Sequence, residues 1–301
     1  MTQHAVIDCD PGIDDALALL LAAGSPELVL DGVTCVAGNR PVEITAQNAA
    51  RLLALAGLSS VPVYAGCERP MGQKQARCNL VHGEDGLGGV SLAPGMPLQN
   101  LHAVEFLAAR LAALQPPLTL IALGPLTNLA LVETLWPGSL RRAESLLIMG
   151  GAFFCPGNVT PAAEFNFFSD PIAARIVLES GARMVFFGLD VTSLAEMPAS
   201  WVESFAALEG NSGQAVLAML RSYALQDPLL HDVCPVAYAL VPELFKTVSA
   251  SVSVNIEEGP QQGKCSSSIG QGSQNSGLEL ALGVDAPGLL RLVRERISAL
   301  P

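Results

Sequence analysis

The chain has 301 residues, of which half are hydrophobic and 15% are charged, and its formal net charge is −12. This is enough apolar material for one large core, and no linker-like stretch divides the chain, so we interpret residues 1–301 as a single domain. The sparse, unclustered Lys and Arg residues argue against binding to nucleic acid or anionic membranes, and no apolar run approaches the ~20 residues of a membrane-spanning helix.

Strand-like and helix-like segments alternate through the first two thirds of the chain. The predicted strands lie at about residues 4–7, 28–36, 61–64, 118–123, 146–149 and 184–188. Two of the predicted helices start at Asp14 and at Thr127. Three more span about residues 41–56, 103–114 and 171–180. This alternation predicts an α/β fold with an open, doubly wound, mostly parallel Rossmann-like sheet that is covered on both faces.

The last third and one internal stretch have different patterns. Residues 66–100 are irregular, which predicts a functional or mobile loop. Strands at about residues 248–256 and 278–284 are expected to pair as a small C-terminal β-hairpin, and the Gly-, Ser- and Gln-rich residues 259–277 between them are expected to be the least ordered. The remaining segments favour helices, at residues 199–226, 232–241 and 289–300.

Four aspartates fall within eight residues near the start of the chain, at Asp8, Asp10, Asp14 and Asp15. They repel one another unless a cation lies among them or some of them hold protons. Acids at the start of a helix can be simple caps, but capping explains one acid and not four. Because the cluster follows the first predicted strand, we predict a site at that strand's carboxyl end, with Asp8 in a supporting role.

Other polar groups are expected at the same edge of the sheet. They are Asn39, the backbone at Leu123, Asp190, the segment 157–166 and the pair His231–Asp232. A pocket rich in acids and amides but poor in cations suits a neutral ligand with many hydroxyl groups, and it would repel a phosphate.

These residues carry a resemblance to a known family. The run Asp8-Cys-Asp10-Pro-Gly-Ile-Asp14-Asp15 resembles the Asp-x-Asp-Pro-Gly-x-Asp-Asp signature of the inosine-uridine nucleoside hydrolases. Further segments match in order along nearly the whole chain: Gly38-Asn39, His82-Gly-x-x-Gly-Leu-x-Gly, Leu123-Gly-Pro-Leu-Thr-Asn128, Met149-Gly-Gly, Gly157-Asn158 to Asn166, Asp170-Pro171, Gly188 to Thr192, and His231-Asp232. The resemblance implies the nucleoside hydrolase fold and hydrolysis of the N-glycosidic bond of ribonucleosides to ribose and a free base.

The resemblance also implies a metal and two catalytic groups. One Ca²⁺ per subunit would be held by the carboxylates of Asp10, Asp15 and Asp232 and by the backbone carbonyl of Leu123, a set of oxygen ligands that suits a hard cation. Asp10 would take a proton from the attacking water as general base. His231 matches the position that protonates the departing base.

Substrate contacts follow from the same matches. The family's ribose-binding positions correspond to Asp14, Asn39, Asn158, Glu164 and Asn166, so deoxyribose is expected to be disfavoured. His82 matches a histidine that borders the nucleobase in pyrimidine-preferring relatives, and together with His231 it favours pyrimidine nucleosides. Met149 is expected to form pocket wall. Tyr223 either stacks on the base or packs within a helix face, with packing slightly favoured.

The resemblance implies a homo-oligomer, a dimer or a tetramer, that works in purine or pyrimidine salvage. Seven scattered cysteines and an N-terminus without a leader pattern predict a cytoplasmic protein. Three alternatives stay open. A haloacid-dehalogenase-like phosphatase or a nucleoside phosphorylase would need a basic phosphate pocket, which we do not find. A non-catalytic nucleoside- or ribose-binding protein would not need both a metal cage and a general base.

Overall fold

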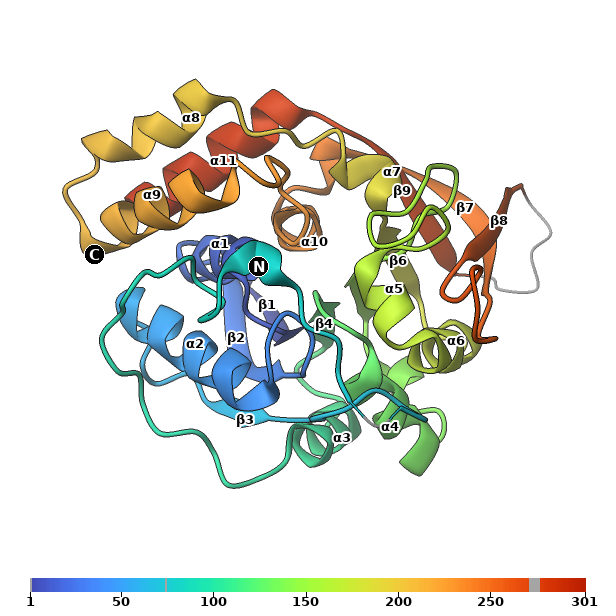
Figure 1. Cartoon of the computed structure of the whole chain (residues 1–301). Helices are drawn as coiled ribbons and strands as arrows, with labels where there is room; N and C mark the ends of the chain where they lie inside the picture. The colour runs from blue at the N-terminus through green and yellow to red at the C-terminus, as the bar shows by residue number, and fades with distance from the viewer. Residues whose placement is uncertain (1, 74, 271–276) are drawn as a thin grey trace.

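The computed structural model describes residues 2–73, 75–270 and 277–301 (Figure 1). Its central feature is a nine-stranded sheet with the order β3-β2-β1-β4-β5-β6-β9-β7-β8. The strands are β1 (Gln3–Cys9), β2 (Leu28–Cys35), β3 (Val63–Ala65), β4 (Leu118–Ala122), β5 (Ser145–Met149), β6 (Met184–Phe187), β7 (Phe245–Val254), β8 (Cys265–Ile269) and β9 (Leu278–Val284). The pairings from β3 across to β9 are parallel, which confirms the doubly wound α/β prediction.

Helices cover both faces of the sheet because alternate strand residues point in opposite directions. Ile7 and Phe187 belong to an apolar cluster with α1 (Ile13–Ala23), α2 (Val42–Leu55), α9 (Asn211–Tyr223), α10 (Val233–Leu240) and α11 (Ala286–Ser298). Their neighbours Val6 and Phe186 belong to a second cluster with α3 (Ala103–Ala112), α4 (Thr127–Leu135) and α6 (Pro171–Glu179). Short helices α5 (Phe165–Ser169), α7 (Leu189–Thr192) and α8 (Ala199–Ser204) complete the fold.

The C-terminal strands form the expected antiparallel pair and also join the main sheet. β7 and β9 do pair antiparallel, but β9 also pairs parallel with β6, so these strands extend the main sheet. A further strand, β8, pairs antiparallel with β7 inside the stretch that was expected to lack order. The remainder of that stretch at residues 271–276 lies outside the described residues.

The irregular stretch at residues 66–100 contains only one short helical turn, Leu80–His82, among its described residues. The segment predicted as helical over 199–226 is divided into α8, a turn at Phe205–Ala207, and α9. No helix in the described parts of the chain is long and apolar enough to cross a membrane.

Candidate active site

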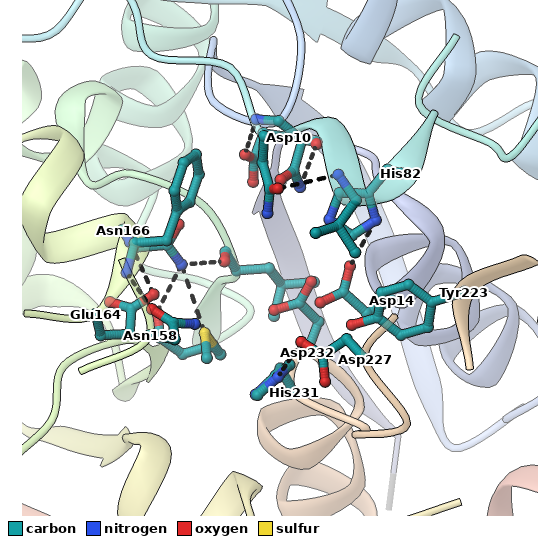
Figure 2. Close-up of a pocket in the computed structure, with 16 residues that line it drawn as sticks. Asp10, Asp14, His82, Asn158, Glu164, Asn166, Tyr223, Asp227, His231 and Asp232 are labelled. Carbon is teal, nitrogen blue, oxygen red and sulfur yellow. Dashed lines mark hydrogen bonds and ion pairs between the residues drawn. The ribbon is translucent and has the colours of Figure 1, made fainter. Parts of the chain in front are cut away.

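A pocket of about 400 Å³ opens beside the carboxyl ends of β1 and β4 (Figure 2). The strand order reverses between these two neighbours, since β2 and β3 lie on one side and β5 and β6 on the other, and open α/β sheets bind ligands at such a point. Most residues predicted from the sequence line this pocket: Asp10, Asp14, Asn39, His82, Leu123, Met149, Asn158, Glu164, Asn166, Tyr223, His231 and Asp232.

Three buried carboxylates form a tight group at the pocket floor. Oxygen atoms of Asp14, Asp15 and Asp232 all lie within 4.8 Å of one another. Asp15 is oriented by the backbone, because Oδ2 accepts the N–H of Gly12 at 2.9 Å and Oδ1 accepts the N–H of Asp10 at 3.2 Å. The group differs from the predicted ligand set in containing Asp14 and not Asp10.

Asp10 has its own fixed setting beside this group. Its Oδ2 atom accepts the backbone N–H of Asn39 at 2.6 Å, and its backbone carbonyl accepts the Asn39 side-chain amide at 3.2 Å. Two glycines make room for the carboxylate. A Cβ atom at Gly38 or Gly124 would lie only 2.0 Å or 2.3 Å from an Asp10 oxygen, so any side chain at either position would displace it.

The buried acids have strongly perturbed protonation. Burial, followed by the charge of neighbouring carboxylates, raises the pKa of Asp10 and Asp232 well above the usual range and that of Asp15 to about 7. Among the described residues, no Lys or Arg side chain lines the pocket to offset these charges. A donor set made only of oxygens and lacking a cation suits a hard metal ion, so the residues present fit the implied metal.

The side of the pocket opposite His82 is organised by Glu164, the N-cap of α5 (Figure 2). Its carboxylate accepts the backbone N–H groups of Asn166, Phe167 and Gly151 at 2.7, 3.1 and 2.9 Å. Asn166 in turn donates its side-chain amide to the carbonyl of Leu123 at 2.7 Å. The Leu123 carbonyl therefore points toward the site, where the sequence predicted a metal ligand.

Two histidines lie at the other end of the pocket. His231 is hydrogen bonded at both ring nitrogens, with Nδ1 at 2.8 Å from the hydroxyl of Thr192 and Nε2 at 3.2 Å from Oδ2 of Asp227. His82 accepts the backbone N–H of Ile13 at its Nδ1 atom, at 3.1 Å. Its ring is stacked on Tyr223, with 5.4 Å between the ring centroids and 19° between the planes.

Tyr223 thus lines the pocket and packs inside the protein at the same time, with only 1% of its surface exposed.

Asp8 does not line the pocket. One of its oxygens accepts hydrogen bonds from Thr34 and Asn128 at 2.6 and 2.8 Å, which supports the structural role expected for it. Asp190 accepts the backbone N–H groups of two loop residues and is likewise structural.

The pocket also contains residues that the sequence did not single out: Asn79, Val81, Phe165 and Asp227. These residues also line an adjoining hollow, together with Gln226 and Phe168. Asp227 had one available signal, its position four residues before His231, but this spacing is too common to be informative without the fold.

The site and the fold can be compared with known proteins. The model of a family described as inosine-uridine preferring nucleoside hydrolase matches residues 5–291. The chain belongs to this family. As a member of the nucleoside hydrolases it is an N-ribohydrolase that acts on small-molecule ribonucleosides. Members of this family generally depend on a metal, and the buried acidic cluster is present here.

Individual relatives of this nucleoside hydrolase show different base specificities. A pyrimidine-specific ribonucleoside hydrolase RihA from Enterobacter sp. (strain 638) is 38% identical over 310 residues, covering 99% of this chain and 98% of the relative. RihA from Citrobacter koseri is 40% identical, covering 87% of each chain. Among solved structures, a purine-preferring ribonucleoside hydrolase from Gardnerella vaginalis has a TM-score of 0.92 and 29% identity, covering 98% of each chain.

Proposed function

We propose that this nucleoside hydrolase depends on Ca²⁺ and favours pyrimidine ribonucleosides. The observation that carries the metal assignment is the group of buried carboxylates within 4.8 Å of one another, in a pocket with no Lys or Arg among its described lining residues. Asp10, Asp15, Asp232 and the carbonyl of Leu123 would hold the ion, with Asp14 close enough to contribute. When bound, the calcium ion would lower the pKa of a water molecule and hold ribose hydroxyl groups.

Asp10 is the proposed general base. The backbone N–H of Asn39 holds one of its oxygens in a fixed direction, at 2.6 Å. The other oxygen faces the backbone at Gly124, where glycine leaves space beside the carboxylate. Asp10 can therefore accept a proton from water that attacks C1′ as the N-glycosidic bond breaks.

Ribose is the proposed occupant of the polar part of the pocket. Asp14, Asn39, Asn158, Glu164 and Asn166 surround it with carboxylate and amide groups that can accept and donate hydrogen bonds to hydroxyls. Contacts to the 2′-hydroxyl would be lost with a deoxyribonucleoside, leaving buried polar groups unpaired.

His231 is the proposed acid for the departing base. Burial opposes its positive charge, but the Asp227 carboxylate and the charges of Asp14 and Glu164 outweigh burial and raise its pKa above the ordinary value. The raised pKa favours the protonated imidazolium, which can donate to a leaving nucleobase.

The preference for pyrimidines rests on two observations. His82 lines the pocket, stacked on Tyr223, where it would border a bound nucleobase, and the relatives at 38–40% identity are named pyrimidine-specific. A purified enzyme assayed for reducing sugar with uridine, cytidine, inosine, adenosine and deoxyuridine tests this directly. We expect uridine and cytidine to be the best substrates and deoxyuridine to be nearly inert.

The same assay tests the metal. A chelator should abolish ribose release, and Ca²⁺ should restore it more fully than Mg²⁺ does. Full activity after exhaustive chelation would sink the calcium proposal. Release of ribose phosphate only in the presence of phosphate would instead identify a phosphorylase.

We further propose a cytoplasmic homo-oligomer, either a dimer or a tetramer. The seven cysteines are all free thiols in the structure, as expected for a reducing compartment. Light scattering of the purified protein would determine the number of subunits, and a monomeric mass with full activity would contradict the oligomer.

A further inference from the structure

Arg40 is an unusual buried cation. Its side chain is buried, with 7% of the residue exposed, and no other described Lys or Arg is buried. None of the ion pairs found in the described parts of the chain includes it, and its Nε atom has no hydrogen-bond partner there. A buried charge without an ionic partner is costly, so its retention calls for a reason beyond packing.

The guanidinium group of Arg40 contacts the loop that carries His82. Its Nη2 atom donates to the carbonyl of Gly83, the residue directly after His82. We call residues 82–89 the His82 loop. Its next turn packs against the Arg40 stem, because a Cβ atom at Gly86 would lie 3.4 Å from Arg40 Cγ.

A side chain from α2, that of Asn48, supports the same loop. Asn48 donates its side-chain amide to the carbonyl of Asp85 at 2.8 Å. Gly86 also lies close to this amide, since a Cβ atom there would be 2.9 Å from Asn48 Nδ2. Arg40 and Asn48 thus each hold the His82 loop by a hydrogen bond to one of its backbone carbonyl groups.

The contacts of the loop define one tautomer of the neutral His82 ring. The Nδ1 atom accepts the N–H of Ile13, so the proton of the neutral ring lies on Nε2. The ring fits only because residue 12 is glycine, as a Cβ atom at Gly12 would lie 2.8 Å from it. The His82 carbonyl is also fixed, accepting the N–H of Gly88 at 3.0 Å.

We propose that Arg40 is a positioning residue that acts through His82 and thereby sets how well the enzyme uses its nucleobase contacts. This inference rests on the proposed function, because His82 matters only when a base occupies its end of the pocket. Arg40 does not line the pocket itself. It acts by fixing the backbone on which His82 is mounted.

Two substrates separate this role from general damage. Uridine carries a nucleobase that would meet His82, whereas p-nitrophenyl riboside shares the ribose but has an activated leaving group without base hydrogen bonds. Arg40→Met should lower kcat/KM for uridine by about 10-fold and for p-nitrophenyl riboside by less than about 2-fold. Arg40→Lys should recover part of the uridine loss, since it retains a charged donor.

A double-mutant cycle tests the route through His82. His82→Ala should lower activity on uridine, and adding Arg40→Met to His82→Ala should cost less than about 2-fold more. Arg294→Met is a matched control, because Arg294 also donates to a backbone carbonyl, that of Ser204 at 3.0 Å, but does not line the pocket. It should leave both substrates unaffected.

Several results would overturn the proposal. Equal losses of kcat/KM on both substrates would mean that Arg40 acts on ribose binding, for example through its neighbour Asn39. Full additivity of Arg40→Met and His82→Ala would mean that Arg40 acts independently of His82. A higher Ca²⁺ requirement in Arg40→Met, restored by Arg40→Lys, would mean that Arg40 only balances the acidic cluster. If Arg40→Met does not fold, Arg40→Gln gives the same comparison. A wild-type enzyme that releases no ribose from any nucleoside would fail the proposed function instead.

Discussion

The Oδ2 atom of Asp227 lies 3.2 Å from Nε2 of His231, the residue four positions later. Because the Thr192 hydroxyl occupies the other ring nitrogen, Asp227 is the charged group that contacts the imidazole directly. Its carboxylate is the main influence that raises the pKa of His231 against the opposing effect of burial. The pair therefore favours the protonated form of this buried histidine.

Asp227→Asn should move the alkaline side of the pH profile to lower pH. The acid must be protonated, so activity is lost as pH rises through the His231 pKa, and removing the carboxylate lowers that pKa. We expect kcat/KM for uridine to fall by about 10-fold at pH 8 and to change little at pH 6. A profile that keeps its wild-type alkaline limb would show that Asp227 does not control His231.

His231→Ala should affect poor leaving groups most. A nucleobase leaves slowly without a proton donor, whereas p-nitrophenolate does not need one. We expect kcat for uridine to fall by about 10²- to 10³-fold and that for p-nitrophenyl riboside to change by less than about 3-fold. Equal losses on the two substrates would argue against an acid role.

Asp10→Asn should remove turnover while the fold is retained. The amide cannot accept the proton of water, so we expect kcat to fall by about 10³-fold or more. Thermal melting should show a folded protein, since the change removes a charge from a repulsive cluster. Asp31→Asn is a useful control, because Asp31 pairs with Arg110 at 2.6 Å and with His4 near the start of β1. It should lower the melting temperature without lowering kcat, and near-wild-type hydrolysis by Asp10→Asn would refute the general-base role.

Glu164→Ala should lower both stability and activity. The carboxylate accepts two backbone N–H groups at the start of α5 and that of Gly151 after β5, and losing these bonds costs about 1–3 kcal/mol, or ~2–10 °C in melting temperature. Asn166 would also lose its fixed position, so KM for uridine should rise.

The Asp285→Ala control removes another N-cap, which accepts the N–H of Gly288 at 3.1 Å at the start of α11. It should lower the melting temperature and leave KM unchanged. If both variants changed KM equally, the effect of Glu164 on substrate binding would be indirect.

The parallel part of the sheet was predictable because its strands are apolar on both faces. Ile7 and Val6 point into different clusters, yet each is buried, so the strand appears in the sequence as a continuous apolar run. β8 was not predictable in this way. Its sequence Cys-Ser-Ser-Ser-Ile is that of an exposed edge strand, and only its pairing with β7 defines it.

The residues of the site also divide into those that the sequence predicts and those that only the fold reveals. Motif residues such as Asp10 and His231 could be named in advance because the family signature assigns them. Arg40 and Asp227 belong to no motif, and each matters through a partner that only the fold brings near, Gly83 for Arg40 and His231 for Asp227. Such positioning contacts depend on tertiary structure and leave little trace in local sequence.

Metal removal should destabilise the protein more at pH 8 than at pH 5. In the metal-free protein, burial and the charge of Asp14 raise the pKa of Asp15 from 3.8 to about 7, and burial does the same for Asp8. Between about pH 4 and 7 the folded state therefore holds protons that the unfolded state releases, so the free energy of unfolding falls as pH rises through this window. Bound Ca²⁺ would replace the proton on Asp15, a proposed ligand, and should stabilise most where that proton is lost.

Melting curves with chelator and with Ca²⁺ at the two pH values test this. We expect Ca²⁺ to raise the melting temperature by ~5–10 °C at pH 8 and by less than about half as much at pH 5, where protons compete with it for the carboxylates. Asp15→Asn removes one of the proposed ligands and should shrink the Ca²⁺ effect at pH 8. An equal Ca²⁺ effect at both pH values would mean that the ion binds away from the buried acids, because an exposed carboxylate site is already ionised at pH 5.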